Sequence, residues 1–277
     1  LEQSDRNAIK IGLTGTPLIG PHANSRALFG DYLHKYYYNA SIADGYTLRL
    51  IREAIATRYQ LQMQQALEQI EVQQGGIERK ALYAHARFVE PMLDYIVSDF
   101  RASRITQGDN SIGGMVVCDS SEQARELYAQ FQQRFPGFSG LRTQDPTTAG
   151  IQEYPKAAET QDGKGFGPRL TAALILHDEG SKEQRKEQIK AFKAGDIDLL
   201  FVYNMLLTGF DAPRLKKLYV GRVIKDHNLL QALTRVNRSY KGFRYGYVVD
   251  FADIQAEFDK TNKAYYDELT AELGDEA

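Results

Sequence analysis

The chain of 277 residues is long enough for one large domain or two ordinary ones. Charged residues make up 25% and hydrophobic residues 43%, a balance typical of a globular rather than a disordered protein. The 34 Lys and Arg residues against 36 Asp and Glu give a net charge of −2, which argues against a uniformly basic nucleic-acid coat. The single cysteine, Cys118, excludes an internal disulfide framework and a cysteine-clustered zinc site, and favours a reducing cytoplasm.

No apolar run approaches the roughly 20 residues that span a bilayer, and no charged-then-apolar leader opens the sequence. The sequence therefore predicts no membrane association. Because the chain starts at Leu1 rather than at a methionine, we expect it to be part of a longer protein.

The first hundred residues are predicted to be mainly helical. Residues 10–13 could form a strand, which the run Thr14-Gly15-Thr16-Pro17 would end sharply. From about residue 48 to 70, and again from 78 to 104, the spacing of apolar residues predicts helices. Pro91 is expected to kink or divide the second of these. One side of that helix would carry Leu82, Val89, Leu93, Ile96 and Phe100.

The second half has short apolar runs that alternate with helical patterns. Ser120 with Gln123, and Ser181 with Gln184, have the spacing of a helix capping box, and the second helix should end at Gly195. Asp226 can cap a further helix over about residues 228–238. Strands alternating with helices imply crossover connections, so we expect an α/β fold with a parallel sheet covered on both faces. The predicted strands are 115–118, 172–176, 199–203, 218–221 and 245–251.

Residues 139–168 are rich in Gly, Thr, Asp and Gln and show no periodicity. This composition predicts a surface insertion in the sheet domain, at about 139–170.

The first candidate functional segment is residues 13–17. Thr14, Gly15 and Thr16 would expose backbone N–H groups and two hydroxyls where a strand ends, and ligands bind at the carboxyl edges of α/β sheets. The alternative is an ordinary exit from a strand into a turn.

The second candidate is residues 204–213, directly after a predicted strand. Gly209 permits a close backbone approach or a positive φ, and Asp211 offers a carboxylate beside it at the sheet edge. The alternative is a turn that needs Gly209 and Pro213 for its shape, with Asp211 capping a backbone amide.

The third candidate lies in the predicted helix 228–238. Gln231, Arg235 and Arg238 stand at positions i, i+4 and i+7, so they would share one helical face. Two arginines and a glutamine that project together suit multidentate phosphate binding or the stabilisation of a transferred phosphoryl group. The alternative is a solvated basic face.

The charge around this third segment is strongly positive. Residues 214–245 carry nine Lys and Arg against Asp226 alone, whereas residues 250–277 are acidic and restore the overall balance. The basic stretch could hold a polyanion, unless nearby acidic residues neutralise it.

In this order, the three segments resemble motifs III, V and VI of superfamily 2 helicases and translocases. Thr14-Gly15-Thr16-Pro17 looks like motif III, the run from Thr208 to Pro213 looks like motif V, and Gln231, Arg235 and Arg238 have the spacing of motif VI. The longer strings MLLTGFDAP (205–213), QALTRVNR (231–238) and GYVVDF (246–251) resemble the motor (R) subunit of type I restriction enzymes. The segments FG (29–30), LHKY (33–36) and ADG (43–45) are similar to the region that follows motif III in that subunit.

The resemblance implies a RecA-like lobe that works with ATP, Mg²⁺ and double-stranded DNA, together with the methyltransferase and specificity subunits. It implies that Arg238, the family's arginine finger, and Arg235 meet nucleotide phosphates, and that Gly209, Asp211 and Gln231 approach the nucleotide. Thr14, Gly15, Thr16 and Thr208 would couple the nucleotide state to DNA.

The resemblance also divides the chain. Residues 1–20 would end a first RecA-like lobe, residues 21–112 would form a helical connector, residues 113–255 would form the second lobe, and residues 256–277 would form an acidic helix.

Several motifs of an ATP-driven nuclease are absent from the sequence. There is no Gly-x-x-x-x-Gly-Lys-Ser/Thr phosphate loop, no Asp-Glu-Ala-His-like magnesium box and no Asp with Glu-x-Lys nuclease set. In the family these motifs precede motif III, so magnesium ligands are expected in a first lobe. His85 and His177 have no partners at metal-ligand spacing and are predicted to be structural.

Two alternatives stay open from the sequence. One is a lobe of another superfamily 2 DNA or RNA helicase, and the other is a non-catalytic α/β interaction module.

Overall fold

The computed structural model describes residues 9–14, 25–31, 33–34, 36, 38–74, 79–135, 170–224 and 226–252. The strands are β1 (Arg49–Ala54), β2 (Gly113–Val117), β3 (Ala172–Ile175), β4 (Leu199–Val202), β5 (Leu215–Val220) and β6 (Tyr245–Asp250). The helices are α1 (Ser25–Phe29), α2 (Tyr38–Ala43), α3 (Thr57–Gln74), α4 (Arg79–Tyr83), α5 (Ala86–Gln107), α6 (Ser121–Arg134), α7 (Lys182–Ala194) and α8 (Asp226–Leu233).

The six strands form one sheet in the order β1-β6-β5-β2-β4-β3, and all neighbouring pairs are parallel. Parallel pairing requires crossovers, which helices supply between all consecutive strands except β4 and β5, where a loop makes the crossing. Strands β2, β4 and β5 are buried along their whole length, as the apolar runs predict for a sheet covered on both faces. The predicted α/β fold is confirmed.

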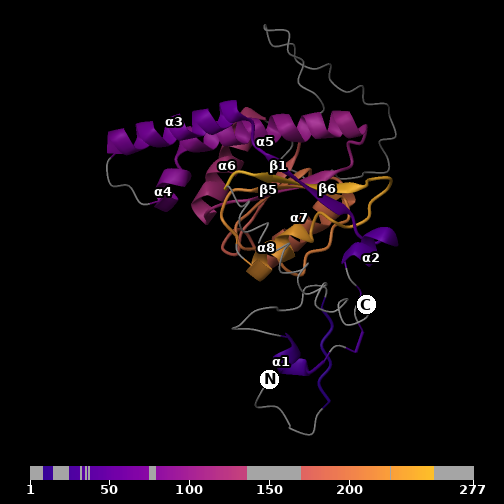
Figure 1. Ribbon diagram of the computed structural model, residues 1–277. Helices are drawn as coiled ribbons and strands as arrows, with labels where there is room; N and C mark the ends of the chain where they lie inside the picture. Colours follow the sequence, from indigo (N-terminus) through magenta and orange to yellow (C-terminus); the bar gives the residue numbers. More distant parts are fainter. Residues whose placement is uncertain are drawn as a thin grey trace.

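Helices cover both faces of the sheet (Figure 1). On one face, α3, α5 and α6 pack side chains such as Phe100 and Leu127 against Val116 and Phe201. On the other face, α7 and α8 pack Phe192 and Leu229 against Val202 and Leu218. Burial of two separate apolar layers on one sheet is the main stabilising contribution to this fold.

The predicted helix ends in the second half are largely confirmed. Ser120 Oγ accepts a hydrogen bond from the Gln123 amide at the start of α6. Ser181 and Gln184 form a complete capping box at the start of α7, which ends at Gly195 in the left-handed conformation.

Helix α5 runs through Pro91, so the prediction that this proline could divide the helix is wrong. The break between α4 and α5 lies at His85, whose Nδ1 accepts a hydrogen bond from the Arg87 amide and caps α5. Pro91 is the sixth residue of α5, beyond the first turn, so it cannot donate the backbone hydrogen bond that an interior helical residue makes. A structural role for His85 is confirmed.

Two further element predictions need correction. Residues 48–70 are not one helix: residues 49–54 form β1, the edge strand beside β6, and α3 begins at Thr57. Residues 10–13 form no strand, and the side chains of Ile9, Ile11 and Leu13 are exposed. A strand needs a hydrogen-bonding neighbour, and the described sheet provides none for this segment.

Among the described residues, no helix has the length and apolar character to cross a membrane. Gly15, Thr16, the core of the predicted insertion and the predicted acidic helix 256–277 lie outside the described residues.

Candidate functional site

The loop after β4 is anchored by its apolar residues and exposes its polar ones. Leu207, Phe210 and Ala212 are buried in the core beneath α8. Thr208, Gly209 and Asp211 alternate with them and are exposed. Two positive φ values shape the loop, 66° at Leu206 and 66° at Gly209, and the second is one that glycine adopts without strain.

The loop crosses one face of the sheet, from the carboxyl end of β4 to the amino end of β5. Asp211 therefore lies near the amino ends of β5 and β1, and not at the carboxyl end of β4, the strand that the loop follows. The length of the connection explains the difference, because it must return across the sheet before the parallel strand β5 can begin.

The segment predicted as a helix over residues 228–238 is helical only as far as Leu233. Gln231 lies in the last turn of α8, Arg235 lies in the turn that follows, and Arg238 forms an antiparallel bridge with Thr47. The three side chains therefore do not share one helical face. The chain leaves the helix because its backbone bonds elsewhere: the Leu48 amide donates to the Asn237 carbonyl over 2.5 Å.

Arg235 connects the end of α8 to the loop. Its Nε donates to the Gln231 carbonyl at 2.9 Å, and its Nη1 donates to the Phe210 carbonyl at 2.5 Å. Burial lowers the pKa of Arg235, and the neighbouring charge of Arg238 lowers it further. Two of the three guanidinium nitrogens thus hold the loop against α8.

Arg238 meets Asp211 directly. Its Nη1 lies 3.1 Å from Asp211 Oδ1, and the two side chains are 42% and 56% exposed. Its Nε is buried, and within the described part of the chain it has no hydrogen-bond partner. The structure therefore brings the second and third candidate segments together, with two arginines and a glycine-containing loop at one site.

This arrangement can bind an anion. The Arg238 side chain is partly exposed and its Nη1 pairs with an exposed carboxylate, so a phosphate oxygen could take the place of that carboxylate. The described residues contain no group of three His, Cys, Asp or Glu side chains that could hold a metal ion. Those residues therefore do not fit Mg²⁺.

The first candidate segment is not part of this site. Thr14 is exposed in a stretch without regular structure, outside the sheet.

The basic stretch 214–245 is less available to a polyanion than its composition predicts. Arg214, Lys216 and Lys217 are only 3%, 0% and 2% exposed. Arg214 Nη1 donates to the carbonyls of Phe192 and Ile197, which ties the ends of α7 and β4 to β5. These cations are buried and bind groups inside the fold, because β5 lies in the middle of the sheet.

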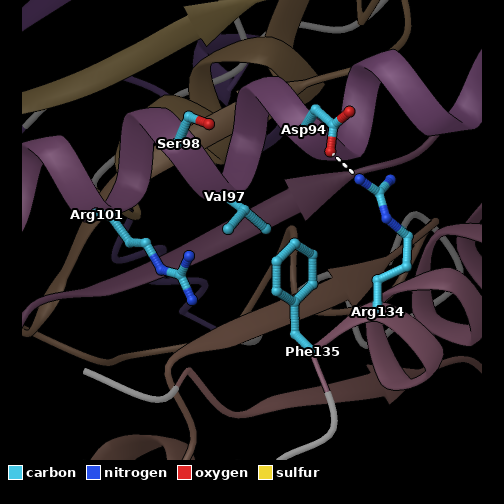
Figure 2. A pocket seen from close by; sticks show the side chains of 6 residues that line it. All are labelled: Asp94, Val97, Ser98, Arg101, Arg134 and Phe135. Atoms are coloured by element: carbon cyan, nitrogen blue, oxygen red, sulfur yellow. Dashed lines mark hydrogen bonds and ion pairs between the residues drawn. The ribbon is translucent and has the colours of Figure 1, made fainter. Parts of the chain in front are cut away.

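A separate pocket of about 220 Å³ lies between α5 and the end of α6 (Figure 2). Arg134 pairs with Asp94, and the guanidinium groups of Arg101 and Arg134 lie 5.4 and 5.7 Å from the centre of the Phe135 ring. This pocket is on the face of the sheet that α5 covers, whereas the loop residues pack beneath α8. It is therefore distinct from the candidate site.

The six-stranded parallel sheet with a helical layer on each face has the architecture of a RecA-like lobe. Residues 151–253 match the family model for domain 3 of the type I restriction enzyme subunit R, and residues 1–81 match that for the SWI2/SNF2 ATPase.

The chain is 24% identical to a type I restriction enzyme endonuclease subunit of Staphylococcus aureus, covering 96% of this chain and 30% of that protein. It is 23% identical to the HindI endonuclease subunit of Haemophilus influenzae, covering 94% and 24%. A fragment assigned as an HsdR subunit of a type I restriction enzyme from Vibrio vulnificus has a similar fold, with a TM-score of 0.55 and 16% identity over 92% of this chain and 41% of that one.

The resemblance predicted from the motifs is confirmed: this chain is related to the R subunit of type I restriction enzymes. It spans less than a third of the length of these curated relatives.

Proposed function

We propose that this chain is the second motor lobe of the R subunit of a type I restriction enzyme, contributing to ATP hydrolysis and to translocation along duplex DNA. The observation that carries the proposal is the 3.1 Å contact between Arg238 and Asp211. It joins the segments that resemble motifs V and VI into one anion-binding site, on a chain related to R subunits over nearly its whole length.

In this proposal, Arg238 is the arginine finger. An exposed ion pair is worth about 0–1 kcal/mol, so a nucleotide phosphate presented from a facing lobe displaces Asp211 at little cost. The guanidinium then stabilises the charge that develops during phosphoryl transfer. The partial exposure of the Arg238 side chain, 42%, supports this role, because Nη1, which pairs with Asp211, is the donor that an incoming anion would take.

The other residues singled out in the sequence have supporting roles in this proposal. Arg235 holds the loop against α8 through the carbonyls of Phe210 and Gln231, next to the position proposed for the phosphate. Gly209, Asp211 and Gln231 approach the nucleotide, while Thr208, Thr14, Gly15 and Thr16 couple its state to the DNA. Because the described residues do not fit Mg²⁺, we propose that its ligands come from the first lobe.

The proposed partners are double-stranded DNA and the methyltransferase and specificity subunits, in the cytoplasm. Translocation would lead to DNA cleavage by a nuclease domain elsewhere in the parent protein. Sequence recognition would belong to the specificity subunit.

The proposal is tested by Arg238→Ala in the full-length protein. Loss of an arginine finger lowers the rate by about 10³–10⁵-fold through lost transition-state stabilisation. Arg244→Ala is the matched control, because Arg244 is exposed just before β6 and has no role in the site. We expect DNA-stimulated ATP turnover to be lost in the first variant and kept in the second. If ATP turnover by Arg238→Ala is within a few-fold of that of the unmodified protein, Arg238 is not the arginine finger.

A further inference from the structure

Strand β5 carries an extra residue at Lys216. Gly113 and Gly114 are consecutive on β2, but their partners on β5 are Leu215 and Lys217, so Lys216 is left without a partner on β2. Such a bulge re-aims a side chain, and bulges are common beside active sites. Here it directs Lys216 towards the segment that follows α8.

Lys216 is completely buried, and its amine forms a hydrogen bond with a main-chain carbonyl. Nζ donates a hydrogen bond to the carbonyl oxygen of Arg238 and lies 5.9 Å from the centre of the Tyr240 ring. In the described part of the chain, Lys216 forms no ion pair with a carboxylate, and the charge that most affects it is that of Arg238. A buried ammonium without a counter-ion is costly, so the fold gains little from this lysine.

The adjacent lysine shows the ordinary arrangement. Lys217 points to the opposite face of the sheet, where Nζ lies 2.6 Å from Glu53 and 2.9 Å from Asp99. Both lysines are buried, yet only Lys217 is paired with acidic groups. The difference indicates that the role of Lys216 lies in its contact with Arg238 rather than in an ion pair that stabilises the fold.

The backbone of Arg238 is held from two directions. Residues 45–48 bind it on one side, through the bridge between Thr47 and Arg238 and through the bond from Ser239 Oγ to the Gly45 carbonyl. Lys216 binds it from β5. Because a strand in the middle of the sheet is rigid, the lysine fixes the start of the Arg238 side chain relative to the sheet.

We propose that Lys216 is a positioning residue for the arginine finger, holding the Arg238 carbonyl so that the guanidinium reaches its phosphate. This inference rests on the proposed function. It differs from a structural role in one respect: removing the amine should impair phosphoryl transfer without destabilising the protein.

The test is Lys216→Met in the full-length protein, with Lys217→Met as the matched control. Methionine has nearly the volume of lysine and removes the charge and the donor. For Lys216→Met we expect kcat for ATP to fall about 10- to 100-fold, as for a misplaced catalytic group, with KM for ATP nearly unchanged and the melting temperature at neutral pH not lowered. For Lys217→Met we expect the reverse, a lower melting temperature with kcat retained, because two carboxylates lose their partner.

The double variant Lys216→Met/Arg238→Ala identifies the route of the effect. If Lys216 acts through Arg238, the double variant is no slower than Arg238→Ala alone. Multiplicative losses, an unchanged kcat in Lys216→Met, or failure of that variant to fold would overturn the inference. If Arg238→Ala alone keeps its ATP turnover, Arg238 is not an arginine finger. The proposed function of that residue is then contradicted independently of the result for Lys216→Met.

Discussion

At the scale of single residues, the site depends on exchangeable contacts around one guanidinium. Arg238 is held by an exposed carboxylate, Asp211, and its Nε has no partner in the described structure. Arg235, four residues from Gln231, has instead committed two nitrogens to main-chain carbonyls. The two arginines that look equivalent in the sequence therefore have different tasks, one holding the loop and one available to an anion.

The burial of Lys216 gives a pH-dependent prediction at this scale. Burial lowers the pKa of the Lys216 amine from 10.5 to about 8, and the nearby Arg238 charge adds to the effect. Between about pH 8 and pH 10.5 the Lys216 amine is protonated in the unfolded chain and deprotonated in the folded chain. The contribution of this group to folding stability therefore rises with pH in this range. Below about pH 8 both states are protonated, and this contribution is constant.

We therefore expect the unmodified protein to gain stability relative to Lys216→Met as the pH rises from about 8 to about 10.5. The measurement is the difference between their melting temperatures across this range, in which groups common to both proteins cancel. A difference that is constant, or that moves in favour of the variant, would contradict the lowered pKa.

At the scale of elements, the sequence predicts the helices and strands whose ends and apolar patterns are set by residues close together in the chain. The apolar runs of β2, β3 and β4 and the caps of α6 and α7 could be predicted, because serine caps and a terminal glycine act within a few residues. Strand β1 could not, since its partner β6 lies about two hundred residues along the chain and its own sequence, RLIREA, has no strong alternation.

The end of α8 was missed for a similar reason. Leu229, Leu233 and Val236 keep helical spacing, yet the helix stops at Leu233 because the next residues bond to residues 47 and 48. The sequence thus singled out Asp211, Arg235 and Arg238, which the structure brings together, but not the geometry of their contacts. Lys216 carried a signal, a charge at the start of an apolar strand, but the strand was predicted to begin two residues later.

Close packing of β6 beneath this turn gives a prediction at the element scale. A Cβ on Gly246 would lie 2.1 Å from the Val236 carbonyl oxygen, a main-chain atom that cannot rotate away. We expect Gly246→Ala to destabilise the protein by about 3 kcal/mol, at the upper end of the usual cost of overpacking. Gly242→Ala is the control, since a Cβ there meets nothing within 4 Å.

Thermal unfolding of the two variants compares them directly. A Gly246→Ala protein as stable as Gly242→Ala would mean that the turn after α8 is not packed on β6 as described.

At the scale of the whole molecule, the distribution of charge limits how DNA is bound. Three of the nine basic residues between 214 and 245 are buried and cannot reach a phosphate. A translocase must also step over every sequence, so its contacts should go to phosphates rather than to bases. We expect DNA binding by this lobe to be weak, indifferent to sequence and strongly dependent on salt, with a slope of about 0.9 for each neutralised phosphate.

Fluorescence anisotropy with a duplex and its scrambled version, at several salt concentrations, measures both properties. A preference for one sequence would count against the motor function.

The last prediction concerns what one lobe can do alone. Phosphoryl transfer needs backbone amides and a lysine around the β- and γ-phosphates, and a carboxylate-held magnesium ion. The sequence contains no phosphate loop, and the described residues contain no metal-binding cluster. Arg238 and Arg235 can stabilise charge on a phosphate, but they cannot replace a metal ion that has no ligands.

We therefore expect the 277-residue polypeptide alone to bind ATP poorly and to hydrolyse none. Adding the first lobe, linked or in trans at high concentration, should restore ATP binding before turnover, because the two halves of the cleft must meet before Arg238 is aligned. The measurements are ATP binding by calorimetry and phosphate release with and without that lobe. Magnesium-dependent ATPase activity of the isolated polypeptide, abolished by Arg238→Ala, would require a complete phosphate site within this chain and would refute its assignment as half of a cleft.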